Sequence, residues 1–268
     1  MPRPTTLDAL VAGLRPPIPI LKVGTAAEAA GVWHSHWYAP GVPGAGAAPS
    51  SGVNGGSHSS PLAGQILRDA PAGGLDAYLA NLRLGATVQG VLLLCDRLWT
   101  NSGLSVTSTS AQAITPAALP ARSEDATANG KGVLAAVEWS AAGGAGTPTV
   151  TLTYTDQDGN TGATGTLVGN ATPVAGAFEV FGLAAGDTGV RAPTSFIQSA
   201  TRTSGTMHLV LFRILASLSI GQANVADKLD VFSGGMPELI DGTVPFLVQI
   251  PSATTATSIS GVMQEAHT

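Results

Sequence analysis

Three residues in the second half of the chain, Asp187-Thr188-Gly189, spell the triplet that carries the catalytic carboxylate of aspartic proteases. That chemistry needs two carboxylates that share one proton. Here Ala184-Ala185-Gly186 precedes the triplet in place of an apolar strand, and the sequence has no second Asp-Thr-Gly or Asp-Ser-Gly. A homodimer would have to supply the second carboxylate. We therefore interpret Asp187 as part of a turn, which Asp and Gly both favour.

A second pattern suggests calcium. Asp156, Asp158 and Asn160 have the alternating spacing of a calcium-binding loop. Such loops need Gly at the sixth position and Glu at the twelfth, where this chain has Thr161 and Leu167. The same stretch contains Asp-Gly, a strong signal for a tight hairpin turn. We expect a hairpin here and no calcium.

Two histidines, His34 and His36, lie two residues apart, so on a strand their side chains would point to the same face. A zinc site needs further ligands. The remaining histidines are scattered along the chain: His58, His208 and His267. We expect His34 and His36 to pack beside Trp33 and Trp37, and we predict no metal and no other cofactor.

The composition also argues against catalysis. Charged residues make up 11% of the 268 residues, whereas soluble domains average about 25%. Neither a complete phosphate-binding glycine loop nor a Gly-x-Ser-x-Gly nucleophile motif is present. We expect no catalytic residues and no enzymatic activity.

Net charge and hydropathy limit the partners. The formal charge of −5 argues against non-specific binding to nucleic acid, which needs a basic surface. Residues 1–17 do not resemble a secretory signal, because Asp8 and Gly13 interrupt the apolar stretch. The most apolar run, 209–220, is cut by Arg213. We expect no membrane partner and a protein that stays soluble until it assembles.

A single cysteine, Cys95, excludes an internal disulfide framework. It follows the apolar run 91–94, so we expect a buried and unreactive thiol.

The first 86 residues differ from the rest. Thr5 or Thr6 can cap a short helix with an apolar stripe, and such a helix needs a partner surface, on its own domain or on a neighbouring subunit. We also predict a small helix over 25–30 and a helical turn or two over 76–82. Residues 39–74 are rich in Gly, Pro and Ser and predict a long surface arm.

From residue 87 onward the pattern is that of strands separated by Gly and Pro turns. The predicted strands are 88–99, 133–140, 149–155, 161–168, 177–183, 194–201, 206–218, 244–250 and 257–264. They favour a mainly β fold, an antiparallel β-sandwich resembling a jelly roll. We predict two parts, an N-terminal docking segment and extended arm (1–86) and a β-sandwich domain (87–268).

Five different short stretches follow one another between about residues 20 and 220. They are Gly24-Thr25-Ala26-Ala27-Glu28-Ala29-Ala30-Gly31 with Trp33-His34-Ser35; Asp96-Arg97-Leu98-Trp99; Leu119-Pro120-Ala121-Arg122; Thr153-Tyr154-Thr155-Asp156-Gln157-Asp158-Gly159; and Leu183-Ala184-Ala185-Gly186-Asp187-Thr188-Gly189-Val190-Arg191. Together they resemble a family of structural proteins from tailed-bacteriophage virions. The resemblance implies a virion component made in the cytoplasm of a bacterial host, and it carries over no catalytic residue.

Among virion roles, we favour a capsid decoration (cement) protein that binds the major capsid protein on the outer surface of the head and self-associates, as a homotrimer by the habit of such proteins. The alternatives are a tail, fibre or receptor-binding protein and the major capsid protein itself, although no long spine helix is evident. We expect the partner contacts in the first 38 residues and the arm. The contact residues we predict are Leu7, Leu10, Leu14, Ile18, Ile20, Trp33, Trp37 and Tyr38.

Overall fold

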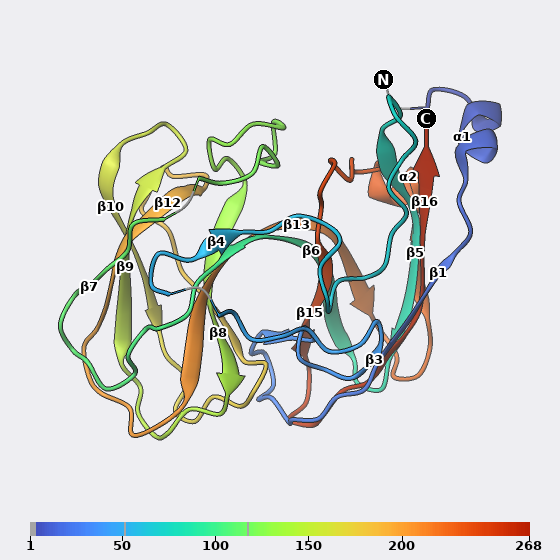
Figure 1. Ribbon diagram of the computed structural model, residues 1–268. Coiled ribbons are helices and arrows are strands. Elements are labelled where there is room, and N and C mark those ends of the chain that lie inside the picture. The colour runs from blue at the N-terminus through green and yellow to red at the C-terminus, as the bar shows by residue number, and fades with distance from the viewer. Residues whose placement is uncertain (1–3, 51, 117) are drawn as a thin grey trace.

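The computed structural model describes residues 4–50, 52–116 and 118–268, and strands dominate them. Figure 1 shows two lobes bridged by two long strands, β6 (Gly90–Thr100) and β13 (Thr206–Ile220). All strand pairs in the described part are antiparallel. The predicted mainly β, antiparallel sandwich is therefore confirmed.

The described strands form three sheets. The central sheet has the order β11 (Phe178–Val180), β8 (Val133–Ala141), β13, β6, β15 (Pro245–Pro251), β2 (His34–Ser35), and β4 (Gly56–Ser57) also pairs with β6. A four-stranded sheet has the order β10 (Thr161–Val168), β9 (Thr149–Asp156), β12 (Val190–Gln198), β7 (Gln112–Ala113). A five-stranded sheet has the order β14 (Asp227–Asp230), β5 (Ala77–Ala86), β16 (Ile259–His267), β1 (Ile18–Lys22), β3 (Gly41–Val42).

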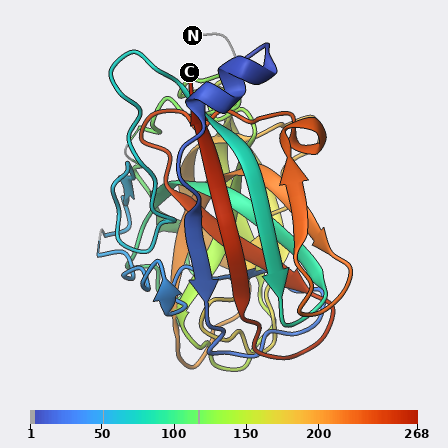
Figure 2. The same cartoon turned by 90° about the vertical axis from the view of Figure 1, so that its right-hand side faces the viewer.

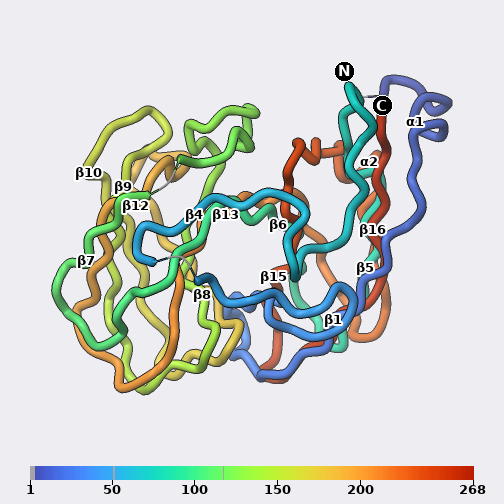
Figure 3. Tube along the Cα trace, in the orientation of Figure 1, coloured from blue at the N-terminus to red at the C-terminus, as the bar shows by residue number. Residues whose placement is uncertain are grey.

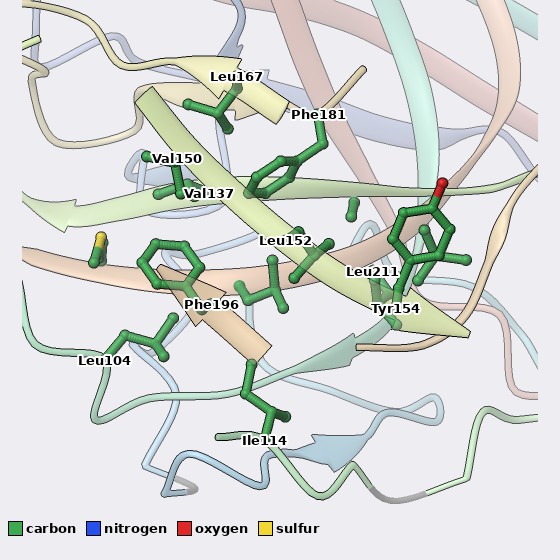
Figure 4. Close-up of a cluster of buried hydrophobic side chains, with 14 of the residues drawn as sticks. Leu104, Ile114, Val137, Val150, Leu152, Tyr154, Leu167, Phe181, Phe196 and Leu211 are labelled. Carbon is green, nitrogen blue, oxygen red and sulfur yellow. The ribbon is translucent and has the colours of Figure 1, made fainter. Parts of the chain in front are cut away.

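Two sandwich cores result, one in each lobe. The first lies where the central sheet meets the four-stranded sheet, and Figure 4 shows Leu152, Phe196 and Leu211 converging there. The second lies between the central and five-stranded sheets and includes Leu84, Leu94 and Leu218.

A third core covers the other face of the central sheet. Along β6, Leu94 points into the second core, whereas its neighbours Leu93 and Cys95 point into the third. This alternation follows from the two-residue period of a strand. The apolar run that begins at Val91 is thus explained by burial on both faces.

The hairpin predicted at Asp158-Gly159 is confirmed. It joins β9 to β10, and Gly159 has φ 88°, a backbone conformation that glycine adopts without a steric penalty. The side chain of Asp156 accepts hydrogen bonds from the backbone N–H groups of Asp158 and Asn160 and from the Asn160 side chain, at 2.8, 2.9 and 2.8 Å. The carboxylate thus serves the turn.

The predicted N-terminal helix is present as α1 (Leu7–Gly13), capped by Thr6, whose hydroxyl accepts a hydrogen bond from the Ala9 N–H at 3.2 Å. The second helix of the described part, α2 (Val231–Gly234), was not predicted.

Two predicted helices are wrong. Residues 76–82 belong largely to strand β5, which lies between β14 and β16 with almost every residue buried or half-buried. Pairing on both edges outweighs the helix propensity of its Ala and Leu residues. Residues 25–30 are irregular, because Glu28 makes an isolated antiparallel bridge with Thr255.

The structure does not divide at residues 86 and 87. Strand β1 from the N-terminal segment pairs with β16 near the C-terminus, and β5 pairs with the other edge of β16 (Figure 2). An N-terminal docking segment separate from the sandwich is therefore wrong, because its strands complete one of the sheets.

The expected free arm is likewise not seen. Within residues 39–74, the tube in Figure 3 runs across the molecule between the lobes. Strand β4 pairs with β6, the His58 N–H donates to the Leu98 carbonyl oxygen at 2.8 Å, and Ile66 is 1% exposed within the second core. Burial of Ile66 and these backbone hydrogen bonds fasten the segment to its own chain.

Candidate functional site

The structure separates the eight predicted contact residues into two groups. On α1, Leu7 is 68% exposed and Leu10 is half-buried, and Leu14, the residue that follows the helix, is 38% exposed. Ile20 and Trp37 are buried, and Ile18, Trp33 and Tyr38 are half-buried.

Trp37 and Tyr38 serve the interior of the protein, so their assignment as surface contacts is wrong. The Trp37 ring packs edge-on against Phe246 and lies 4.5 Å from the guanidinium carbon of Arg97. The Tyr38 hydroxyl donates a hydrogen bond to Glu138 at 3.0 Å. The assignment of Ile20 as a surface contact is wrong for the same reason, since its side chain packs in the second core. Alternation along β1 turns Ile18 and Ile20 toward one face of the sheet.

Helix α1 keeps its role as a surface element. None of the residues Leu7–Gly13, all of which the structure describes, is buried. Leu7 and Val11, one helical turn apart, are 68% and 58% exposed. A helix of this length is marginal in water by itself, and these two apolar side chains are open to solvent.

Helix α2 adds an exposed aromatic residue that the sequence analysis missed. Phe232 is 92% exposed. The Asp230 carboxylate accepts hydrogen bonds from the N–H groups of Phe232 and Ser233 at 3.1 and 3.2 Å, and the Ser233 hydroxyl accepts one from the Asp230 N–H at 3.1 Å. This capping box was visible in the sequence as Asp230 followed three residues later by Ser233 and then by Gly234-Gly235.

A groove of about 240 Å³ lies between the two helices. We call it the helix groove; its lining residues are Leu10, Leu14, Ala80, Asn81, Lys228, Asp230, Val231, Phe232 and Gln264. The groove is apolar along the helices, and Lys228 and Asp230 form an exposed ion pair of 3.3 Å at its side. Among the described pockets it is the one lined by two exposed large apolar side chains, Leu14 and Phe232.

The interior holds buried ion pairs. Arg97 donates two hydrogen bonds to Glu138, at 3.1 and 2.5 Å, and both side chains are fully buried. Burial alone would lower the pKa of Arg97, but the Glu138 charge outweighs it and the pKa is raised. Burial would likewise raise the pKa of Glu138, and the Arg97 charge holds that pKa below its ordinary value. The pair is therefore ionised.

Two further buried pairs tie loops to strands. Arg122 donates to both oxygens of Asp96, at 2.9 and 3.3 Å, and to the His58 carbonyl oxygen at 2.9 Å. Arg68 donates to Glu265 at 3.1 Å. Each pair joins residues far apart in the sequence and so braces the fold.

The two histidines predicted to share a face lie near each other, with ring centroids 5.3 Å apart. The His36 ring is within hydrogen-bond distance of the Gln249 side chain, 3.1 Å, and burial, followed by the nearby His34, lowers the pKa of His36 to about 3. The Glu28 carboxylate lies 4.0 Å from His34. Within residues 4–50, 52–116 and 118–268, no three His, Cys, Asp or Glu side chains are arranged to hold a metal ion.

Asp187 lies in the predicted turn. Its carboxylate accepts a hydrogen bond from the Tyr154 hydroxyl at 2.6 Å, and its N–H donates to the Ala184 carbonyl oxygen at 3.1 Å. Burial and the hydrogen bond to Asp187 raise the pKa of Tyr154 to about 12. Asp187 thus anchors a loop on the core residue Tyr154.

Cys95 is fully buried, as expected, and burial followed by the charge of Asp96 raises the pKa of its thiol well above the ordinary value. At neutral pH the thiol stays protonated, and a protonated thiol is a poor nucleophile.

A second hollow, of about 430 Å³, crosses the middle of β13, where Glu124, Arg213 and Glu238 line it. Arg213 donates to the Ser123 carbonyl oxygen at 3.4 Å, and its Nε and Nη2 are buried without a hydrogen-bond partner among the described residues. Burial lowers the pKa of Arg213. Because both nitrogen atoms are covered, the hollow does not present the donor edge of the guanidinium to a ligand.

Neither described helix has the length and apolar character needed to cross a membrane. Comparison of the chain with protein-family models, with curated proteins and with solved structures finds no match.

Proposed function

We propose that this protein is a structural component of a tailed-bacteriophage virion, a capsid decoration (cement) protein that binds the major capsid protein on the outer surface of the head. The observation that carries the proposal is helix α1, a capped helix without a buried residue that presents Leu7 and Val11 to solvent. The sequence resemblance supports the virion role, and the exposed helix supports the assignment of a docking element.

The body behind the helix suits a mechanical role. Buried ion pairs such as Arg97–Glu138 and Arg122–Asp96 fasten loops and strands together in the interior. Buried charges that have lost a partner are costly, so each pair favours one arrangement of the segments it joins. A body of this kind transmits force between its contacts with little change of shape. Copies that are joined to one another would bind one shell more tightly than a single copy does, through multivalency.

The partner is expected to be a protein surface rather than nucleic acid. The net charge of −5 opposes binding to a phosphate backbone, and α1 exposes two large apolar side chains, Leu7 and Val11. We propose that Leu7 and Val11 insert into an apolar depression of the major capsid protein.

The proposal is tested on purified particles. Mass spectrometry of virions should find the protein in hundreds of copies, whereas a handful of copies would favour the tail, fibre or receptor-binding alternative, and absence would refute a virion role. Particles whose shell is built from this protein alone would favour the alternative of the major capsid protein, because the chain would then be the shell itself.

Binding to shells that lack the protein tests the docking element. The double variant Leu7→Asp, Val11→Asp should bind at least about tenfold more weakly, since each change places a charge in an apolar contact. Val168→Asp is the matched control, because Val168 is 73% exposed on β10, away from α1. Equal binding by the double variant and the control would show that α1 is not the docking element.

A further inference from the structure

A serine and a histidine on neighbouring strands of the central sheet are hydrogen-bonded to each other near the end of β8. The Oγ atom of Ser140 lies 2.7 Å from Nε2 of His208 on β13. His208 is fully buried, whereas Ser140 is half-buried and is followed by the exposed residues Ala141 and Ala142. The serine is therefore the member of the pair that has exposed surface.

The backbone of Asn101 fixes which ring nitrogen of His208 carries the proton. Nδ1 of His208 lies 3.1 Å from the Asn101 carbonyl oxygen, which can only accept a hydrogen bond. In the neutral ring Nδ1 must therefore carry the proton, and Nε2 is left to accept one. The Ser140 hydroxyl thus donates to Nε2. A hydroxyl that donates to an oriented imidazole has the arrangement of a nucleophile and its general base.

Asn101 is itself held in place by three further hydrogen bonds. Its N–H donates to the Leu209 carbonyl oxygen at 3.1 Å, and its side-chain oxygen accepts from the Leu209 N–H at 2.7 Å. Its side-chain amide donates to the Val53 carbonyl oxygen at 3.2 Å. The carbonyl group that orients the imidazole is therefore fixed before any substrate binds, as the supporting residues of a reactive site must be.

A β-bulge places Ser140 outside the regular pairing of β8 with β13. The register shifts between Thr206 and Met207, which leaves Ser140 as the extra residue. Bulges re-aim side chains and are common next to active sites. The Thr206 carbonyl oxygen lies 3.5 Å from Ser140 Oγ, so it is a much weaker acceptor for the hydroxyl proton than the imidazole nitrogen.

The surroundings of His208 favour a ring that is neutral at rest and can take up a proton during a reaction. Burial has the largest effect on the pKa of His208 and lowers it. Two charged groups act on the ring in opposite directions: Glu138, which pairs with His208 across the two strands, raises the pKa, and Arg97 on β6 lowers it. The carboxylate has the larger effect of the two, so it stabilises the imidazolium when the ring accepts the serine proton.

We propose that Ser140 and His208 act as nucleophile and general base, and that they transfer the acyl group of a small carboxylic ester to water. The Oγ atom of Ser140 attacks the ester carbonyl carbon while its proton passes to Nε2 of His208. The bond from that carbon to the alcohol oxygen breaks, and the alcohol leaves with the proton, so that an acyl-serine remains. Water then attacks the acyl carbon and gives a proton to Nε2, the carboxylic acid leaves, and Ser140 regains its proton from the imidazole.

The substrate is expected to be small and uncharged. A Cβ at Gly205 would lie 2.7 Å from the Cα atom of Gly143, so the loops after β8 and before β13 pack closely beside the serine. The charge of Arg97 is already balanced by Glu138 and is not free for an anionic substrate. The proposal departs from the expectation, drawn from composition, of no enzymatic activity, and it does not depend on the virion role.

Reaction of the purified full chain with p-nitrophenyl acetate tests the proposal. We expect release of p-nitrophenolate and an acetyl group on Ser140, which mass spectrometry of proteolytic peptides locates. Ser140→Ala should lower the rate of release by about a hundredfold or more, the lower end of what general-base catalysis contributes. Ser219→Ala is the matched control and should react like the wild type, because it removes an exposed hydroxyl from β13.

The pH dependence separates this reaction from direct attack by hydroxide. Because burial lowers the pKa of His208 below its ordinary value of about 6.5, the rate should stay level above about pH 7 and fall only at more acidic pH. Hydroxide attack would instead rise in proportion to the hydroxide concentration. His208→Gln should lower the rate by about a hundredfold while circular dichroism verifies the fold.

A wild type without an acetyl group on Ser140, or a Ser140→Ala variant that releases p-nitrophenolate as fast as the wild type, overturns the proposal. Either result would mean that the hydrogen bond between Ser140 and His208 only joins β8 to β13. If His208→Gln does not fold, the Ser140→Ala variant and the pH dependence still decide the outcome. Failure of the acyl transfer leaves the virion role untouched, since that role is tested on particles.

Discussion

Several buried polar side chains of this protein hold separate segments of the chain together. Arg97 connects β6 to Glu138 on β8, and Tyr38 donates a third hydrogen bond to the same carboxylate. The Lys22 ammonium is held by three carbonyl oxygens, those of Ala39, Pro43 and Gly44, at 3.0–3.1 Å, and burial lowers its pKa to about 8. Ionisable groups in the interior are thus used to hold segments of the chain together.

Replacing Glu138 by Gln should destabilise the protein by about 3–5 kcal/mol, because the buried Arg97 charge would lose its counter-ion. Urea unfolding at neutral pH measures the change in the free energy of unfolding. The matched control is Glu124→Gln, whose ion pair with Lys131 is 4.0 Å long and exposed on both sides. The control should change stability by less than about 0.5 kcal/mol.

The same pair predicts a pH dependence. The pKa of Glu138 is lower in the folded protein than in the unfolded chain, so the unfolded chain binds its proton first as the pH falls. The difference in the free energy of unfolding between wild type and Glu138→Gln should therefore be largest above the ordinary pKa of Glu. It should shrink as the pH falls through the lower pKa that Glu138 has in the folded protein. A loss below about 1 kcal/mol at neutral pH would contradict a buried ionised pair.

At the scale of elements, the N-terminal region divides between α1 and β1. Helix α1 contributes no buried residue, and its link to the sheet includes the hydrogen bond from the Arg15 N–H to the Glu265 carbonyl oxygen, 2.9 Å, just after the helix. Strand β1, in contrast, lies between β16 and β3 and buries Ile20 and Lys22. The docking role that we propose and the folding role therefore fall to neighbouring but different elements.

Removing residues 1–13 should change the free energy of unfolding by less than about 1 kcal/mol, since none of the side chains of residues 4–13 is buried. Removing residues 1–38 should prevent stable folding, because β16 loses its β1 neighbour and the central sheet loses β2. Thermal unfolding followed by circular dichroism distinguishes the two. A folded 39–268 fragment would show that the N-terminal strands are dispensable.

For the whole molecule, β6 and β13 decide how the lobes behave. Each strand contributes side chains to all three cores: Leu94, Leu93 and Leu98 from β6, and Leu218, Val210 and Leu211 from β13. Neither lobe can unfold completely while these strands remain in the other. The molecule is thus expected to behave as one cooperative unit in spite of its two-lobed shape (Figure 1).

Scanning calorimetry should show a single transition whose calorimetric and van't Hoff enthalpies agree. Leu211→Ala in the first core and Leu218→Ala in the second should each cost about 2–5 kcal/mol and shift the entire transition to lower temperature. Two separable transitions, with each variant moving only one of them, would show that the lobes unfold independently.

Much of the strand content was readable in the sequence, because strands leave a local signature. The alternation in 149–155 and the Asp158-Gly159 turn predicted the β9–β10 hairpin, since side chains alternate between faces and glycine permits the turn. The nearly continuous apolar run in 88–99 predicted β6, which the structure buries on both faces. The Thr6 cap and the apolar stripe predicted α1.

The candidate site was only half predictable. The sequence correctly placed Leu7 on an exposed helix, but periodicity alone cannot show which apolar residues find a partner within the chain. Trp37 meets Phe246 more than 200 positions away, and Ile20 joins a core made from the far end of the sequence. Phe232 was missed because a helix of four residues has no apolar periodicity, and its capping residues mark the helix ends without showing whether the ring between them is buried.

The amino-acid sequence by itself determined that this is an antiparallel β protein with a capped N-terminal helix, because turns, caps and strand periodicity are fixed by neighbours a few residues apart. Only the tertiary structure decided that residues 76–82 form a strand, that the Gly- and Pro-rich segment crosses its own molecule, and that α1 and α2 meet around one groove. These outcomes depend on pairing between segments such as β1 and β16, which lie at opposite ends of the chain. The free energy of such long-range contacts cannot be inferred from a pattern of neighbouring residues.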